Sequence, residues 1–486
     1  MSSRTSTISD PAAPESLYVK RRKIQVRDIT GRFRKLKWQV LVLLLAIYYI
    51  VPWLRWDRGP NAPSQAVLVD FPARKFYFFF IEIWPQEVYY LTGILIMMAI
   101  GLFGITATIG RVWCGFACPQ TVWTDLFMAV ERFVEGDRNA RLKLDQAPMS
   151  VNKALRRIAK HILWLLIALA TGGAWVFYFA DAPTLAVELA HFQASTAAYA
   201  TIGLLTLTTY SFAGLAREQI CTYACPYSRF QAAMLDEHSI VVTYRTDRGE
   251  PRGKASRVAT PAAPAAKLGD CIDCAACVTV CPTGIDIRNG QQLECINCGL
   301  CIDACDHVMD KVDRPRGLIA LDTLANLEQR RTGVDPNPKL KIWRPRVFVY
   351  MALWLGVGLV MLVTLLTRPN LEMSVQRDRN PLFVTLSDGG VRNGYTFHLI
   401  NKMHVERQAV LSVEGLPGAR IYVLNLGEKP EPTLTLGPDA VTAERVFVTV
   451  PRGALTADST DFRFVLRDPA SGDEAHYGGI FRGPGK

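Results

Sequence analysis

The grouping of the twelve cysteines limits what this 486-residue chain can fold into more than any other feature of its sequence. They fall into two close pairs and two longer runs, and no cysteine lies outside these four groups. A secreted disulfide framework, or a set of scattered core thiols, would not be grouped in this way. The sequence therefore predicts sites that are built from thiols.

Eight of the cysteines have the spacing of iron–sulfur ligands. Residues 271–281 read C-x2-C-x2-C-x3-C, followed by Pro282, and residues 295–305 repeat the spacing. In two-cluster ferredoxins the fourth cysteine of each run binds the other cluster. We therefore expect two 4Fe-4S clusters, one bound by Cys271, Cys274, Cys277 and Cys305 and the other by Cys295, Cys298, Cys301 and Cys281. Zinc also takes four thiolates, but two interlocked runs disfavour it. Asp306 replaces the usual proline after the last cysteine, which predicts a local change in the turn.

The other four cysteines form two matching pairs. Both pairs read C-x2-A-C-P, in the segments W-C-G-F-A-C-P-Q and C-T-Y-A-C-P-Y, and their cysteines are Cys114, Cys118, Cys221 and Cys225. Each pair follows an apolar window and precedes an amphipathic run, so the two form a weak internal repeat. Proline suits the first turn of a helix, which predicts N-cap positions for Cys118 and Cys225, where the helix dipole favours thiolate. Such thiolates suit Cu(I), zinc or iron–sulfur chemistry, and burial as small packing residues is the alternative.

Five uncharged windows are long enough, or nearly so, to span a membrane as helices of about 20 residues. They cover approximately residues 38–54, 89–110, 162–180, 195–216 and 347–367. The first begins well inside the chain and has no cleavage site after it, which indicates an anchor rather than a signal peptide. A sixth apolar run, 76–84, is too short and contains Glu82, so we expect an interfacial or re-entrant segment there.

The basic residues predict the orientation. Nine lysines and arginines precede the first window between residues 20 and 37, against Asp28 as the single acid, and the segment 132–160 is also basic. The positive-inside rule then places the N-terminus, 111–161 and 217–346 in the cytoplasm, and the tail after 367 outside. The net charge of +11 is explained by this topology and by attraction to anionic lipid, so nucleic-acid binding is not expected.

The predicted fold is a multi-domain membrane protein with an α-helical transmembrane domain of about five spans, a two-cluster ferredoxin-like α+β domain and a C-terminal all-β immunoglobulin-like sandwich. The expected boundaries are a basic N-terminus at 1–37, a transmembrane domain at 38–245, a linker at 246–269, the ferredoxin-type domain and its connection at 270–346, the last helix at 347–367 and the sandwich at 368–486. About seven short β-rich runs separated by turn residues support the sandwich.

His398 and His404 lie near Met403 and could form a copper site, although exposed polar positions are the favoured interpretation.

The order of these motifs resembles one known family. The two C-x3-C-P pairs, the double ferredoxin run, a fifth span and a β-sandwich tail are similar to the cytochrome c oxidase accessory proteins CcoG, FixG and RdxA, from about residue 20 to the end. The resemblance implies a bacterial inner-membrane, multi-pass protein with a cytoplasmic ferredoxin domain and a periplasmic tail. It implies a cupric reductase that converts Cu(II) to Cu(I) for assembly of cbb3-type oxidases, with Cys114, Cys118, Cys221 and Cys225 in copper reduction or binding.

Two other functions stay open. The C-x3-C-P pairs also occur in NapH-type quinol dehydrogenase subunits, and a non-enzymatic copper chaperone or assembly scaffold would use the same thiols. The expected partners are the membrane, a cytosolic electron donor, copper ions as substrate or bound ion, and oxidase assembly factors. The oligomeric state is not readable from the sequence, a dimer being one option.

Overall fold

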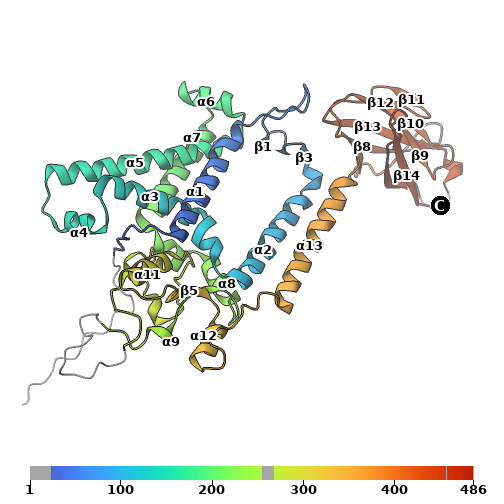
Figure 1. The fold of residues 1–486 in the computed structure, drawn as a ribbon. Coiled ribbons are helices and arrows are strands. Elements are labelled where there is room, and N and C mark those ends of the chain that lie inside the picture. Colours follow the sequence, from blue (N-terminus) through green and yellow to red (C-terminus); the bar gives the residue numbers. More distant parts are fainter. Residues whose placement is uncertain (1–22, 254–267, 456, 485–486) are drawn as a thin grey trace, which may run out of the picture. The chain divides into compact units, whose positions relative to one another are not determined.

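The structure is a computed structural model that describes residues 23–253, 268–455 and 457–484 (Figure 1). Most of the predicted linker, and Lys20, Arg21 and Arg22 of the basic N-terminus, lie outside these residues. The chain divides into two compact units. Unit 1 contains Met1–Tyr49, Ile96–Val176 and Ala194–Trp354, and unit 2 contains Ile50–Leu95, Phe177–Gln193 and Leu355–Lys486.

Four helices of the described chain are long and apolar enough to cross a membrane. They are α1 (Arg32–Ile50) with the short 3-10 helix η1 (Val51–Trp53), η2 (Pro85–Glu87) with α2 (Tyr89–Ile109), α5 (Val151–Val176) and α13 (Pro345–Leu366). The remaining predicted window, 195–216, is helical but changes character along its length. Its α part, α7 (Thr196–Thr209), has 14 residues and continues as the π-helix η4 (Tyr210–Ala216). Fourteen residues rise about 21 Å, less than a hydrocarbon core of about 30 Å, so the fifth span stays a prediction.

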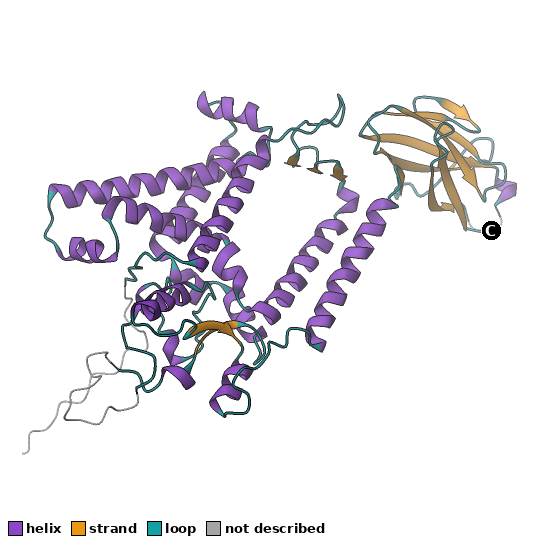
Figure 2. Cartoon of the chain, viewed as in Figure 1, coloured by secondary structure: helices purple, strands orange, loops and turns teal. Residues whose placement is uncertain are grey.

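Unit 1 also contains shorter helices, and several of them begin at or contain a cysteine of the two pairs (Figure 2). They are the π-helix η3 (Trp113–Ala117), α3 (Pro119–Glu135), α4 (Arg138–Gln146), the π-helix η5 (Ile220–Ala224) and α8 (Pro226–Met234). Helix α3 has one apolar face, which buries Val122, Phe127 and Met128. Phe127 stacks on Trp164 of α5 with ring centroids 5.3 Å apart, so that the amphipathic pattern of α3 fixes it against an apolar helix.

The ferredoxin-type part of unit 1 is small and α+β. Strand β4 (Val241–Tyr244) pairs antiparallel with β5 (Ile319–Asp322), and α9 (Thr246–Gly249), α10 (Ala276–Thr279), η7 (Ile287–Asn289), α11 (Leu300–Lys311) and α12 (Leu324–Arg331) complete it. Strand β4 precedes the predicted linker, and β5 begins about 75 residues later. Both cysteine runs lie between these two strands in the sequence, so the pairing of β4 with β5 joins the start of this part to its end.

Unit 2 contains two antiparallel sheets that share one core. One sheet has the order β11-β10-β13-β8-β6 with β7 beside β8, and the other has the order β12-β9-β14-β15. The strands are β6 (Leu371–Arg377), β7 (Val384–Thr385), β8 (Val391–Asn401), β9 (Arg407–Glu414), β10 (Arg420–Val423), β11 (Gly427–Lys429), β12 (Thr433–Leu436), β13 (Ala440–Val450), β14 (Ser459–Arg467) and β15 (Glu474–Arg482). Alternate residues such as Tyr395, Phe397 and Leu399 of β8 point into this core and meet Phe464 of β14.

Unit 2 also contains α6 (Ala182–Ala190) and a third sheet of three strands, β1 (Val67–Asp70), β2 (Lys75–Phe78) and β3 (Ile81–Ile83). The apolar run 76–84, expected to be interfacial or re-entrant, therefore forms a β-hairpin. Its backbone bonds are made between strands, while Phe80 is exposed at the turn. Glu82 of β3 is buried, and its carboxylate lies 3.1 Å from His404 Nε2.

Candidate redox site

The two ferredoxin runs fold into loops of the same backbone form. Asp273 and Ala275 of the first run have φ of 54° and 54°, and Asn297 and Gly299 at the matching places of the second run have φ of 58° and 73°. These residues lie in the left-handed region, which L-residues rarely adopt, so the shared pattern is imposed by the path of the cysteines. A glycine is needed at Gly299, because a Cβ there would lie 2.6 Å from the ring of Phe33.

Two cavities lie beside these loops, and the eight thiols line them. One is lined by Cys271, Cys274, Cys277 and Cys305, and the other by Cys281, Cys295, Cys298 and Cys301, with Cys277 also at its edge. Cys281 of the first run thus lines the cavity of the second run, and Cys305 of the second run lines the cavity of the first. This exchange follows from the packing of α11 against α10. Burial raises the pKa of Cys277 to about 11 and the pKa values of Cys295 and Cys305 to about 12. Thiols held protonated in this way need a bound cationic centre to become thiolate ligands, and the two sets of four donors fit two 4Fe-4S clusters.

The departure at Asp306 has a structural reason. The first run ends at Cys281-Pro282, after the short helix α10 has finished, whereas Cys305 and Asp306 lie inside α11. Proline in a helix interior would remove a backbone hydrogen bond and clash with the preceding turn. The Asp306 carboxylate instead accepts a hydrogen bond from the Gly317 N–H at 2.9 Å. The sequence predicts a local change in the turn at Asp306. In the structure the change is that helix α11 continues past this residue.

The two C-x2-A-C-P motifs also share one local structure. In each motif the first cysteine lies in a π-helix (η3 or η5) and the second is the N-cap of the next helix, α3 or α8, with proline at its first position. The N–H of Cys118 donates to the Trp113 carbonyl at 2.8 Å, and the N–H of Cys225 donates to the Ile220 carbonyl at 2.8 Å. The internal repeat seen in the sequence is therefore a repeat of backbone geometry, and such π segments occur frequently at functional sites.

The four thiols of these motifs are close enough to influence one another electrostatically. Burial, together with Cys118, Cys114 and Cys225, raises the pKa of Cys221 to about 12. Burial also raises the pKa of Cys114 to about 11, which Arg111 opposes. Cys118 is the N-cap of α3, but its thiol makes no side-chain capping hydrogen bond, and burial raises its pKa. The thiolate character that the helix dipole favours at this cysteine is therefore opposed by burial.

The first motif lies directly against the loop of the second cluster cavity. A Cβ at Gly115 would lie 2.7 Å from the Ile296 carbonyl oxygen and 3.1 Å from the Cα of Cys298. Cys114 packs on the apolar cluster that includes Ile296 and Cys298. Only glycine permits this approach, so the sequence W-C-G-F brings the Cys114 thiol beside the loop that contains Ile296 and Cys298.

Residues near this site that the sequence analysis missed include Gln231 and Arg111. Gln231 is fully buried on α8, and its Oε1 accepts a hydrogen bond from the Cys114 thiol at 2.7 Å. Arg111 is also buried and donates to the Leu293 carbonyl beside the second run. Arg111 adjoins the motif in sequence and could have been noticed for its charge. Gln231 carries no sequence signal, because its role depends on the packing of α8 against η3.

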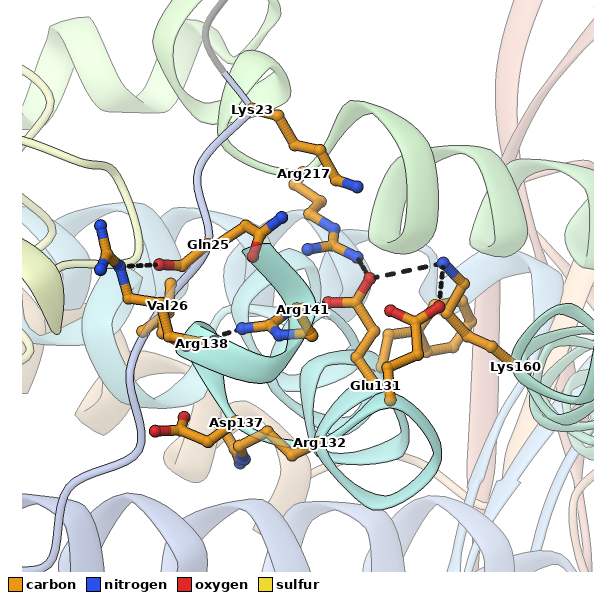
Figure 3. A network of polar contacts seen from close by, with 12 residues as sticks. Lys23, Gln25, Val26, Glu131, Arg132, Asp137, Arg138, Arg141, Lys160 and Arg217 are labelled. Carbon is orange, nitrogen blue, oxygen red and sulfur yellow. Dashed lines mark hydrogen bonds and ion pairs between the residues drawn. The ribbon is translucent and has the colours of Figure 1, made fainter. Parts of the chain in front are cut away.

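A buried ionic network joins the two motifs (Figure 3). Glu131 of α3 pairs with Arg217, which precedes the second motif, at 2.6 Å and with Arg141 at 2.7 Å. Burial raises the pKa of Glu131, but these arginines and Lys160 outweigh burial and hold it below its usual value. Arg141 also donates to the carbonyl of Val26 at 2.7 Å, which binds the N-terminal segment to α4. Glu131, on the helix that follows the first motif, therefore contacts the arginine that precedes the second motif. Through Arg141 it is also linked to the segment that leads into α1.

A second polar contact fixes the ferredoxin-type part to α1. Asp303 of α11 accepts hydrogen bonds from the N–H groups of Phe33 and Arg34 at 3.2 and 2.8 Å. These are first-turn donors of α1 that have no partner within the helix, so Asp303 acts as an N-cap supplied from a distant segment. The cluster-binding helix is thereby docked on the start of an apolar helix.

Comparison with known proteins agrees with this geometry. Family models match a 4Fe-4S dicluster domain at residues 216–323, a 4Fe-4S binding domain at 91–135 and the immunoglobulin-like fold at the C-terminus of FixG at 361–484. The nitrogen fixation protein FixG of Rhizobium meliloti is 51% identical, covering 96% of this chain and 94% of its own. Protein RdxB of Cereibacter sphaeroides is 51% identical, covering 97% and 98%, and protein RdxA of the same organism is 49% identical, covering 95% and 96%. A crystal structure of a FixG-related protein from Vibrio parahaemolyticus covers 23% of this chain and 95% of its own, with 26% identity and a TM-score of 0.21.

The apolar helices, the two cluster cavities and the C-terminal sheets define a membrane-bound iron–sulfur redox protein. The chain belongs to the FixG/RdxA family, because relatives of about half identity align with nearly its full length. The family resemblance drawn from the cysteine motifs is thereby confirmed.

Proposed function

We propose that this protein is a membrane-bound cupric reductase that converts Cu(II) to Cu(I) for assembly of a cbb3-type cytochrome oxidase. The observation that carries the proposal is the approach of Gly115 to Cys298, which supports electron transfer between the second cluster loop and the first pair of thiols. Electron transfer to a metal at those donors requires such proximity. Thiols favour Cu(I) over Cu(II), so the same site that receives the electron stabilises the product.

The chain's own groups have defined tasks in this reaction. Cys114, Cys118, Cys221 and Cys225 would bind the copper substrate. Burial raises the pKa values of Cys114, Cys118 and Cys221, so these three thiols would release protons on binding. Gln231 holds the Cys114 side chain through its amide oxygen. The 4Fe-4S clusters, when bound by the eight ferredoxin-type cysteines, supply single electrons, and one electron reduces one Cu(II) to Cu(I).

We also propose the orientation that the basic residues predict, in a bacterial inner membrane. The division of the chain supports it, since the segments expected in the cytoplasm, 111–161 and 217–346, fall within unit 1. The connection 181–193 and the tail after 367, expected outside, fall within unit 2. The electron donor would then be cytosolic, and oxidase assembly factors would receive Cu(I).

The test is a cupric reductase assay on anaerobically purified protein with Cys114 and Cys118 both replaced by alanine. We expect Cu(II) reduction to be abolished while the EPR signals of both reduced clusters remain. Turnover at the wild-type rate in this variant would contradict the proposal. Stoichiometric copper binding by wild-type protein without turnover would favour a chaperone, and rapid cluster reduction by quinol without a copper response would favour a quinol dehydrogenase.

A second candidate role for the four thiols is to bind a third iron–sulfur cluster. The match of residues 91–135 to a 4Fe-4S binding domain favours it, because that segment contains Cys114 and Cys118. Among the described residues, no three of these thiols have sulfur atoms that all lie within 4.8 Å of one another. Iron analysis of the same double variant separates the candidates, since loss of a third cluster would lower the iron content.

A further inference from the structure

Unit 2 brings together three metal-ligating side chains that are far apart in the sequence. Glu82 lies in β3, His404 in the turn that follows β8, and Asp439 directly before β13. One donor atom of each lies within 4.8 Å of the other two, and His404 Nε2 lies 3.1 Å from Glu82 Oε1. Ligands around a tetrahedral zinc ion with bonds of about 2.0–2.1 Å are roughly 3.3 Å apart, so this pair already has the required separation.

The two carboxylate ligands of this group are deeply buried. The side chains of Glu82 and Asp439 are 7% and 5% exposed. His404 Nδ1 is also buried, and among the described residues it has no hydrogen-bond partner. Two carboxylates at such burial are costly unless cations face them.

Lys75 supplies part of that positive charge. Its Nζ lies 2.7 Å from Asp439 Oδ1 and 3.7 Å from the ring centre of Trp84, and its side chain is 9% exposed. The charges of Lys75 and Arg58 also act on Glu82, whose Oε1 faces His404 Nε2. A cation bound between the three ligands would compete with Lys75 for Asp439.

We propose that Glu82, His404 and Asp439 form a binding site for a divalent transition-metal ion, with Zn²⁺ and Cu²⁺ as the ions that suit its donors. One imidazole nitrogen and two carboxylate oxygens are borderline-to-hard ligands, which favour these ions over Cu(I), and the imidazole disfavours Mg²⁺ and Ca²⁺. Three protein ligands leave a fourth position for water or an exchanging ligand, as in open zinc sites. The proposal is independent of the role of the cysteines.

The site is distinct from the copper pair considered at residues 398 and 404. His398 is exposed on β8 between the neighbouring strands β6 and β13, and is not among the three converging ligands. The two histidines therefore provide a matched comparison, one inside the proposed site and one outside it on the same sheet.

The experiment uses the full-length, cluster-loaded protein in which Cys114, Cys118, Cys221 and Cys225 are serine, so that these thiols do not compete for metal. Anaerobic calorimetric titration with Zn²⁺ should show one site that His404→Ala weakens by roughly 100-fold, since even loss of a supporting group costs about 10–100-fold. Glu82→Gln, which keeps the shape, should also weaken binding, whereas His398→Ala should leave the affinity unchanged. Lys75→Met should raise the affinity several-fold by removing the competing cation.

A second measurement guards against loss of folding. The EPR spectrum of one equivalent of Cu²⁺ should show coupling to one imidazole nitrogen, which His404→Ala removes and His398→Ala retains. Absence of Zn²⁺ binding to the parent protein would overturn the proposal. Equal affinities for the parent, His404→Ala and Glu82→Gln would overturn it as well.

Discussion

The two C-x2-A-C-P motifs take the same backbone path but have different surroundings. In the first motif Gly115 and Phe116 are buried against the ferredoxin-type part. At the matching places of the second motif, Thr222 is half-buried and Tyr223 is 66% exposed. The repeat thus supplies two similar pairs of thiols, while packing makes the first pair the one that adjoins a cluster loop. The following predictions separate what the two motifs share from what distinguishes them.

The largest difference is expected between matched substitutions at the residue after each first cysteine. Gly115→Val places side-chain atoms where the Ile296 carbonyl lies, so we expect the second cluster loop to be displaced and its cluster lost. Thr222→Val keeps shape and volume and should retain both clusters. Iron analysis and EPR spin quantitation measure this, and retention of both clusters in Gly115→Val would show that the close approach is not required. Gly173→Ala, at a position with open space, controls for glycine replacement in general.

A somewhat smaller effect is expected from the ion pair that secures the helix of the first motif. Asp125 of α3 lies 2.9 Å from Arg34 and 3.7 Å from Lys37, and all three side chains are at most 7% exposed. Asp125→Asn leaves two buried cations without their partner and should cost about 3–5 kcal/mol. Asp28→Asn, whose carboxylate is half-exposed and 3.6 Å from Arg132, should cost about 0–1 kcal/mol. Thermal unfolding in detergent compares the two, and equal losses would contradict the assignment.

The same carboxyl group predicts a pH dependence. Burial raises the pKa of Asp125, but Lys37 and Arg34 outweigh burial and lower it below the ordinary value. Because the folded-state pKa is lowered, the stabilisation is fully present above the unfolded value of about 3.9 and is lost as the pH falls through the folded value. The stability difference between wild type and Asp125→Asn should therefore be constant near neutral pH and decrease only below about pH 4. A difference that changes between pH 6 and pH 8 would indicate another group.

The smallest effect is expected at Gln231, which contacts the first motif from the helix of the second. Gln231→Leu removes the acceptor of the Cys114 thiol, a bond worth about 1 kcal/mol, and also removes a buried amide N–H that has no partner. We expect stability to change by less than about 1 kcal/mol while Cys114 is alkylated several-fold faster. Gln219→Leu, whose amide bonds only the neighbouring Glu218, is the control. Equal alkylation rates in both variants would show that Gln231 does not hold the thiol.

The sequence by itself determined the features that depend on short spacing. The runs 271–281 and 295–305 specify iron–sulfur binding because ligands a few residues apart are positioned by their own loop, and the model of a 4Fe-4S dicluster domain matches this part of the chain. The apolar windows likewise identify helices. In the window 195–216, however, the α-helix continues as a π-helix, which the hydrophobic pattern of the sequence does not predict. The N-caps at Cys118 and Cys225 follow from the adjacent prolines.

Only the tertiary structure decided which distant groups meet and how far they are buried. Cys118 lies at the N-cap of α3, where the helix dipole lowers a thiol pKa, yet burial raises the pKa of this thiol. Lys37 and Lys160, which count toward a positive cytoplasmic face in the sequence, are buried in ion pairs with Asp125 and Glu135. The ligands of the proposed ion site in unit 2 come from residues more than 300 positions apart along the chain. Such contacts depend on packing and desolvation, which are properties of the folded chain and leave no spacing in the sequence.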